Sequence, residues 1–126
     1  MAETGSAVVG RLLAGGGVAT SRLTEVEVAS ALVRRARERA FSLRQRNRAL
    51  AALEADFASL YVVELSPEVA ATARRLLVRR RLRASDAVHL ASCLFLQRGL
   101  ESSVPFVVFD ERLKQAAVAE GLSVVP

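Results

Sequence analysis

The 126-residue sequence contains a single cysteine, Cys93, and no long apolar stretch. One thiol cannot form a bridge within the chain, which excludes a disulfide scaffold and fits a reducing cytoplasm. No apolar run reaches the roughly 20 residues that span a bilayer. The first residues also lack a basic segment followed by an apolar one, so no secretory signal is expected. These absences predict a cytoplasmic protein that does not contact a membrane.

The sequence also lacks the residue sets that most enzyme chemistries require. His89 and Cys93 are the only histidine and cysteine, so the usual zinc ligand sets are missing. Neither a glycine-rich phosphate-binding loop nor the GxSxG motif of serine hydrolases is present. What remains is a set of carboxylates, in a chain that has only three aspartates.

The charge balance is basic, and nearly all of the basic residues are arginine. The formal net charge is +5, and hydrophobic residues make up 52% of the chain, which is enough for one domain with a core. A moderate positive charge suits a nucleic acid or an acidic protein as partner. A bias of codon usage would also explain the excess of arginine over lysine.

Apolar periodicity and capping residues predict helices that alternate with short apolar strands. We expect helices over residues 6–13, 24–39, 42–59, 86–98 and 111–120, and one more that begins at Pro67. We expect strands over residues 18–20, 61–65, 106–109 and 122–125. This order is typical of an α/β fold, with a parallel sheet covered by helices on both faces.

Three acids stand where such a sheet places a binding site. Asp110 directly follows an expected strand, and Glu27 and Asp86 lie in the first turns of expected helices. Clustered carboxylates are hard oxygen ligands that suit Mg²⁺ or Mn²⁺, and such ions can activate water for attack on a phosphodiester. Each acid also has a structural interpretation. Glu27 would complete a capping box with Thr24, Asp86 would complement a helix dipole, and Asp110 would cap the last helix.

Other polar groups have simpler structural interpretations. Ser85 is expected to cap the helix that Gly99 ends. His89, one helical turn from Asp86, is typical of an orienting or core histidine, and Cys93 of core filling. The arginines at 79–83 are interpreted as a solvated helix end.

Three segments resemble the acidic motifs of PIN-domain toxins of the VapC type. Residues 21–32 (SRLTEVEVASAL) look like the second-acid motif, residues 82–92 (LRASDAVHLAS) like the third, and residues 106–113 (FVVFDERL) like the strand and the fourth acid. All three occur in the family's order with compatible helices between them. The resemblance covers nearly the whole chain, which would form a single PIN-like domain over residues 1–126.

The resemblance implies a PIN-like three-layer fold and a metal-dependent endoribonuclease of a type II toxin–antitoxin pair. Residue by residue, it makes Glu27, Asp86 and Asp110 the catalytic and metal-binding carboxylates, with Mg²⁺ or Mn²⁺ as the cofactor. Glu25 and Asp56 match no acidic position of the family. The implied partners are an RNA substrate such as tRNA or rRNA, a second copy of the chain, and a small antitoxin whose tail enters the site.

The family's first, central strand and its acid have no counterpart here. We expect either a true start roughly 20 residues upstream, long enough for one strand and its turn, or a decayed gene. Two other functions stay open. The chain could be a degenerate PIN-like module that binds antitoxin or RNA without cleavage. It could also be a basic interaction protein whose acids only cap helices.

Overall fold

The computed structural model describes residues 17–126, so the helix expected over 6–13 lies outside the described residues. The elements are, in order, β1 (Ala19–Ser21), α2 (Arg22–Arg37), α3 (Leu43–Ser59), β2 (Tyr61–Val63), α4 (Pro67–Arg79), α5 (Ala84–Leu100), β3 (Phe106–Val107), α6 (Glu111–Ala119) and β4 (Val124–Val125). Every helix and strand expected in this part of the chain is present, although most of the strands are shorter than expected. No helix in the described range is long and apolar enough to cross a membrane.

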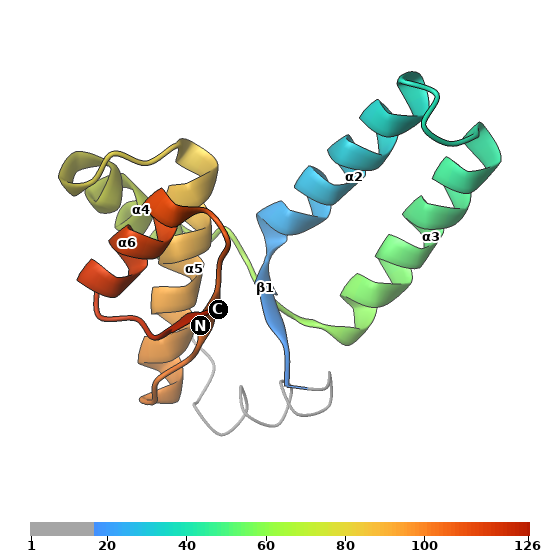
Figure 1. Ribbon diagram of the computed structural model, residues 1–126. Coiled ribbons are helices and arrows are strands. Elements are labelled where there is room, and N and C mark those ends of the chain that lie inside the picture. The colour runs from blue at the N-terminus through green and yellow to red at the C-terminus, as the bar shows by residue number, and fades with distance from the viewer. Residues whose placement is uncertain (1–16) are drawn as a thin grey trace.

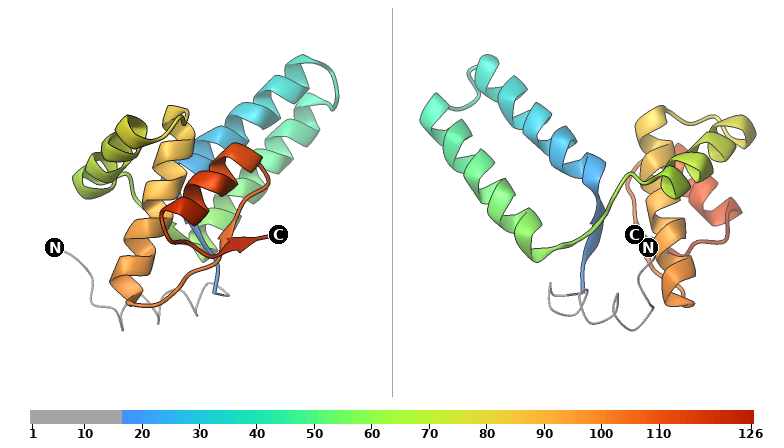
Figure 2. Two further views of the ribbon diagram at one scale, coloured as in Figure 1. Left: turned by 60° about the vertical axis from the view of Figure 1, so that its left-hand side comes forward. Right: turned by 180° about the vertical axis from the view of Figure 1, so that it is seen from behind.

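Helices α2 and α3 form a hairpin that stands apart from the other helices (Figure 1). We call this hairpin the arm, and the group formed by α4, α5, α6, β3 and β4 the body. The opposite view in Figure 2 shows the same separation, with β1 running between the two parts. The far end of the arm, where α2 turns into α3, points away from the body.

Serine hydroxyls begin three of the helices. Ser21 accepts a backbone N–H at the start of α2, and Ser66 does the same at the start of α4, where Pro67 takes the first helical position. At the start of α3, Ser42 and Gln45 form a complete capping box. Each such cap contributes about 1 kcal/mol by satisfying an amide that has no partner within the helix.

The expected capping box of Thr24 and Glu27 is wrong. The N-cap of α2 is Ser21, three residues before the expected Thr24, and the helix begins at Arg22. The Thr24 hydroxyl accepts a hydrogen bond from the Thr20 hydroxyl at 2.9 Å. The structural interpretation of Glu27 as a capping acid therefore fails, which leaves its carboxylate available for another contact.

The expected ends of α5 are also wrong. Arg83 precedes the first helical residue and makes no side-chain cap, so Ser85 lies inside the helix. Gly99 does not end the helix, which continues to Leu100. The chain leaves it at Glu101, whose φ of 53° is in the left-handed region. A local glycine signal was overridden here because a non-glycine residue supplies the helix-ending conformation.

The strands form two separate pairs in the part of the chain that the structure describes. β1 pairs with β2 in parallel, Ala19 opposite Tyr61, and β3 pairs with β4 in parallel, Phe106 opposite Val124. The parallel pairing agrees with the prediction, but the expected single sheet is seen as two halves.

Each two-stranded sheet has two outer edges, one on each strand, that have no strand partner among residues 17–126. The N–H groups of Phe106 and Val108 donate to the carbonyls of Ser123 and Val125, and the Val18 carbonyl accepts from Tyr61 of β2. Because successive peptide groups of a strand point to opposite sides, the Val107 N–H points toward the other edge. Residues of β1 and β3 line a common hollow, described below.

The hydrophobic core lies in the body. Its central side chains are fully buried on α4 and α5, with Val69, Leu76 and Leu90 the largest of them. The complete cluster is Val63, Val69, Ala73, Leu76, Ala87, Leu90, Ala91, Leu96, Val108, Leu113, Ala116, Ala117 and Leu122. Helices α2 and α3 contribute none of these residues, and their own buried apolar side chains are Ala36 and Phe57.

Candidate functional site

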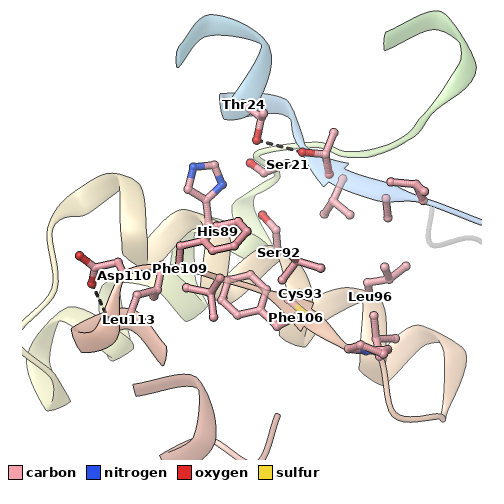
Figure 3. A pocket seen from close by; sticks show the side chains of 18 of the residues that line it. Ser21, Thr24, His89, Ser92, Cys93, Leu96, Phe106, Phe109, Asp110 and Leu113 are labelled. Carbon is pink, nitrogen blue, oxygen red and sulfur yellow. Dashed lines mark hydrogen bonds between the residues drawn. The ribbon is translucent and has the colours of Figure 1, made fainter. Parts of the chain in front are cut away.

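A hollow of about 590 Å³ lies between β1 and β3. We call it the groove. One wall is residues 17–21 with Thr24, the other is residues 104–110 with Leu113, and the floor comes from α5 and Val63. Figure 3 shows that aromatic and aliphatic side chains fill much of it, with polar groups concentrated at one end. This end holds Ser21, Thr24, His89 and Asp110.

Glu27 reaches from α2 to α5, where its carboxylate contacts Nε2 of His89. The two residues are 62 positions apart in the sequence, so this contact joins the arm to the body. The Glu27 side chain is 42% exposed and that of His89 is 22% exposed. His89 is therefore not enclosed in the core, and its ring contacts the Glu27 carboxylate. An orienting role for His89 stays a prediction.

Asp86 lies in the first turn of α5, one turn before His89. An acid there is favoured by the helix dipole, by about 0.3–1 kcal/mol, which agrees with its structural interpretation. The same position also places Asp86 and His89 on neighbouring positions of one helix face, since residues three apart are adjacent on a helix. Asp86 is half-buried and does not line the groove.

Asp110 caps α6, as one of its two interpretations predicted. Its Oδ1 accepts the Leu113 N–H at 2.9 Å. Figure 3 shows this carboxylate turned toward Leu113, while the His89 ring points toward Ser21 and Thr24. Asp110 is exposed and lies at the end of the groove, so its second oxygen remains available to a ligand.

Burial shifts the pKa of Cys93, which lines the groove, and an ion pair shifts that of Glu64. Desolvation by burial raises the pKa of the Cys93 thiol to about 11, so this thiol is protonated at neutral pH. The Arg22 guanidinium donates to both carboxylate oxygens of Glu64, at 2.9 and 2.6 Å, and thereby lowers the pKa of Glu64. This ion pair joins the base of the arm to the segment that follows β2.

The sequence model of the PIN domain matches residues 2–119 of this chain. The chain belongs to the PIN-domain family. No curated protein matches it. The match and the short parallel strands between helices confirm the predicted α/β, PIN-like fold. PIN domains are generally nucleases that act on RNA or other nucleic acids and use divalent metal ions.

The described residues, 17–126, do not form a complete binding site for the divalent metal ion that PIN domains generally use. No three His, Cys, Asp or Glu side chains in this range lie close enough together to hold an ion. The Glu27 carboxylate contacts His89, and one Asp110 oxygen is engaged by a backbone amide. The metal-binding role of Glu27, Asp86 and Asp110 therefore stays a prediction.

The structure adds residues to the site that the sequence did not single out as site residues. Ser21 and Thr24 lie at the polar end of the groove beside His89 (Figure 3). Both belong to the first motif of the PIN resemblance, which is the signal that could have found them. The arginines expected to form a solvated helix end are in part engaged, because Arg79 and Arg80 both pair with Glu120.

Proposed function

We propose that this PIN domain is an endoribonuclease toxin of the VapC type, acting with a divalent cation on RNA phosphodiester bonds. The observation that carries the proposal is the family match over residues 2–119. The three motifs with Glu27, Asp86 and Asp110 support the VapC assignment by resemblance. The basic net charge of +5 supports a polyanionic substrate, because phosphate neutralisation dominates the affinity of nucleic-acid-binding proteins.

The proposed cation-binding and catalytic groups are the carboxylates of Glu27, Asp86 and Asp110, with Mg²⁺ or Mn²⁺ as the ion. Carboxylate oxygens are the ligands that these hard cations prefer. In the folded chain Glu27 and Asp86 are both close to His89, by a contact and by helical spacing respectively. Asp110 lines the same groove as His89.

The proposal includes the partners that the resemblance implies. They are a cognate antitoxin protein and a second copy of the chain, in the cytoplasm. The exposed apolar side chains at the groove support a protein partner there, since Val18, Val107 and Phe109 are 55%, 64% and 84% exposed. Apolar residues gathered at one place on a surface are typical of protein contacts.

A second candidate is a PIN domain that binds RNA or an antitoxin without cleavage. The specific observation in its favour is that the described residues assemble no group of three metal ligands. In this case Glu27 would serve only to hold the arm against α5 through His89.

Incubation of the purified chain with total RNA separates the two candidates. The nuclease proposal predicts fragments in the presence of Mg²⁺ or Mn²⁺ that disappear with a chelator and in Asp86→Asn. Calorimetric titration with Mn²⁺ provides a readout without RNA, and the Asp86→Asn variant should bind the ion more weakly. Retained RNA binding without fragments would support the second candidate. Fragments that persist with chelator would contradict the proposed use of a cation.

A further inference from the structure

The positive charge of the molecule is concentrated at the far end of the arm. Residues 34–48 contain seven arginines and one acid, Glu38, so this segment has a formal charge of +6, more than the +5 of the whole chain. The arginines are Arg34, Arg35, Arg37, Arg39, Arg44, Arg46 and Arg48. We call this set the arm tip. All but Arg46 are exposed, and Arg46 is half-exposed.

The charges of the arm tip are not neutralised within the described part of the chain. The ion pairs there involve Arg22, Arg79, Arg80 and His89, and none involves an arginine of the arm tip. The hydrogen-bond partner of the Arg46 side chain is the neutral amide of Asn47. Seven like charges therefore stand together in water, which raises the free energy of the folded chain through self-repulsion.

Helix electrostatics explain only part of this pattern. Arg34, Arg35 and Arg37 lie in the last turn of α2, where positive charge is favoured by the helix dipole. Arg44 and Arg46 lie at the start of α3. Positive charge is unfavourable at the start of a helix, and the first turn of α3 contains no acid. The helix dipole therefore does not explain Arg44 and Arg46, whereas a polyanionic ligand outside the chain would.

The hairpin brings the two groups of arginines to one place. The capping box of Ser42 and Gln45 fixes the turn between α2 and α3, so the end of one helix meets the start of the next. Both orientations in Figure 2 show this end clear of the body, which leaves room for an extended ligand. Leu43, 62% exposed, is the one strongly exposed large apolar side chain at this end.

We propose that the arm tip binds the phosphate backbone of the RNA substrate. This inference rests on the proposed function and adds a substrate-binding surface remote from the three carboxylates. Guanidinium groups bind phosphates through paired, charge-assisted hydrogen bonds, which suits a chain of phosphates. The surface fits an acidic protein less well, because protein interfaces need a cluster of apolar anchors and the arm tip offers only Leu43.

The test compares two triple variants that remove the same charge. One replaces Arg37, Arg44 and Arg48 of the arm tip with Gln, and the control replaces Arg74, Arg81 and Arg98, which are also exposed and form no ion pair. Binding of a fluorescent RNA of about 20 nucleotides is measured by anisotropy, in EDTA to prevent cleavage, between 50 and 200 mM salt. Circular dichroism confirms that all three proteins are folded.

We expect the arm-tip variant to bind at least about tenfold more weakly at 0.1 M salt, and the control less than about twofold more weakly. The slope of log affinity against log salt should fall by about 2, because each lost phosphate contact removes about 0.7. Equal weakening of both variants would overturn the inference, since net charge alone would then explain it. Competition by poly-glutamate as strong as that by unlabelled RNA would also overturn it, in favour of an acidic protein.

The failure of this inference is distinguishable from failure of the proposed function. Cleavage is measured separately with Mg²⁺ on the same three proteins. If the parent chain does not cleave RNA but the arm-tip variant still loses RNA binding, the inference stands and the nuclease proposal is rejected. If the parent chain cleaves RNA but the arm-tip variant binds RNA as tightly as the parent does, the nuclease proposal stands and the inference is rejected.

Discussion

The body and the arm of this PIN domain are stabilised in different ways. The body buries Val69, Leu76 and Leu90 completely, in a cluster shared by α4, α5 and α6. The arm buries only Ala36 and Phe57 and relies on caps and on the packing of two helices against each other. Stability therefore resides in the body, while the arm can carry a charge pattern that disfavours folding.

The largest effect is expected from shortening a side chain in the body. Leu90→Ala should lower the free energy of unfolding by about 2–5 kcal/mol, because a fully buried leucine leaves a cavity when it is removed. Val26→Ala in the arm, at a side chain that is 61% exposed, should change it by less than about 0.5 kcal/mol. Urea unfolding followed by circular dichroism measures both. Similar losses of stability in the two variants would contradict the conclusion that stability resides in the body.

The next largest loss of stability is expected from removing the helix cap that Asp110 provides to α6. Asp110→Ala should lower stability by about 1 kcal/mol, because the Leu113 N–H loses its acceptor. Asp110→Asn should remain close to the parent chain, since asparagine caps a helix about as well as aspartate. Thermal unfolding of the two variants side by side is the measurement. An equal loss in both would mean that the charge, and not the cap, stabilises α6.

The ion pair between Arg22 and Glu64 should contribute little, even though it joins the base of the arm to the segment that follows β2. Its side chains are 40% and 62% exposed, so a double-mutant cycle should give a coupling of about 0.2–1 kcal/mol. Because the pKa of Glu64 is lowered in the folded chain, this contribution is present above the unfolded pKa and is lost as pH falls through the folded pKa. A coupling that stays constant from pH 7 to pH 3 would contradict the assignment.

The last effect, which is confined to alkaline pH, concerns Cys93, whose thiol lines the groove. Burial raises its pKa to about 11, so native protein should react with a disulfide reagent far more slowly at pH 8 than unfolded protein does. The raised pKa contributes stability that is present below the unfolded pKa and is lost between about pH 9 and 11. Fast labelling of the folded chain would show that the groove floor is open to solvent.

The sequence predicts the parts of the fold that depend on neighbouring residues. Ser66 and Pro67 start α4 as expected, because a cap and a fixed φ act within one turn. Thr24 and Gly99 carry similar local signals and misled the prediction. In the first case Ser21 provides an earlier cap, and in the second Glu101 supplies the left-handed residue. Local signals compete, and the sequence does not show which one the rest of the structure favours.

The site is less predictable, because its contacts join distant segments. The contact between Glu27 and His89 spans 62 residues, and no periodicity encodes it. The division of the expected sheet into two half-sheets also depends on which strands meet in space. By contrast, counting charges along the chain would have revealed the arm tip, since residues 34–48 hold seven arginines. Such a count does not show that the hairpin brings these arginines together at one end.

Cleavage of a labelled RNA by the parent chain and by Asp110→Asn, both in Mg²⁺, tests the proposed nuclease most directly. The substitution keeps the helix cap and removes the charge, so any loss of activity is separated from a loss of folding. The account predicts that the parent chain cuts the RNA and that the folded variant does not. Equal cleavage by the two proteins would contradict it.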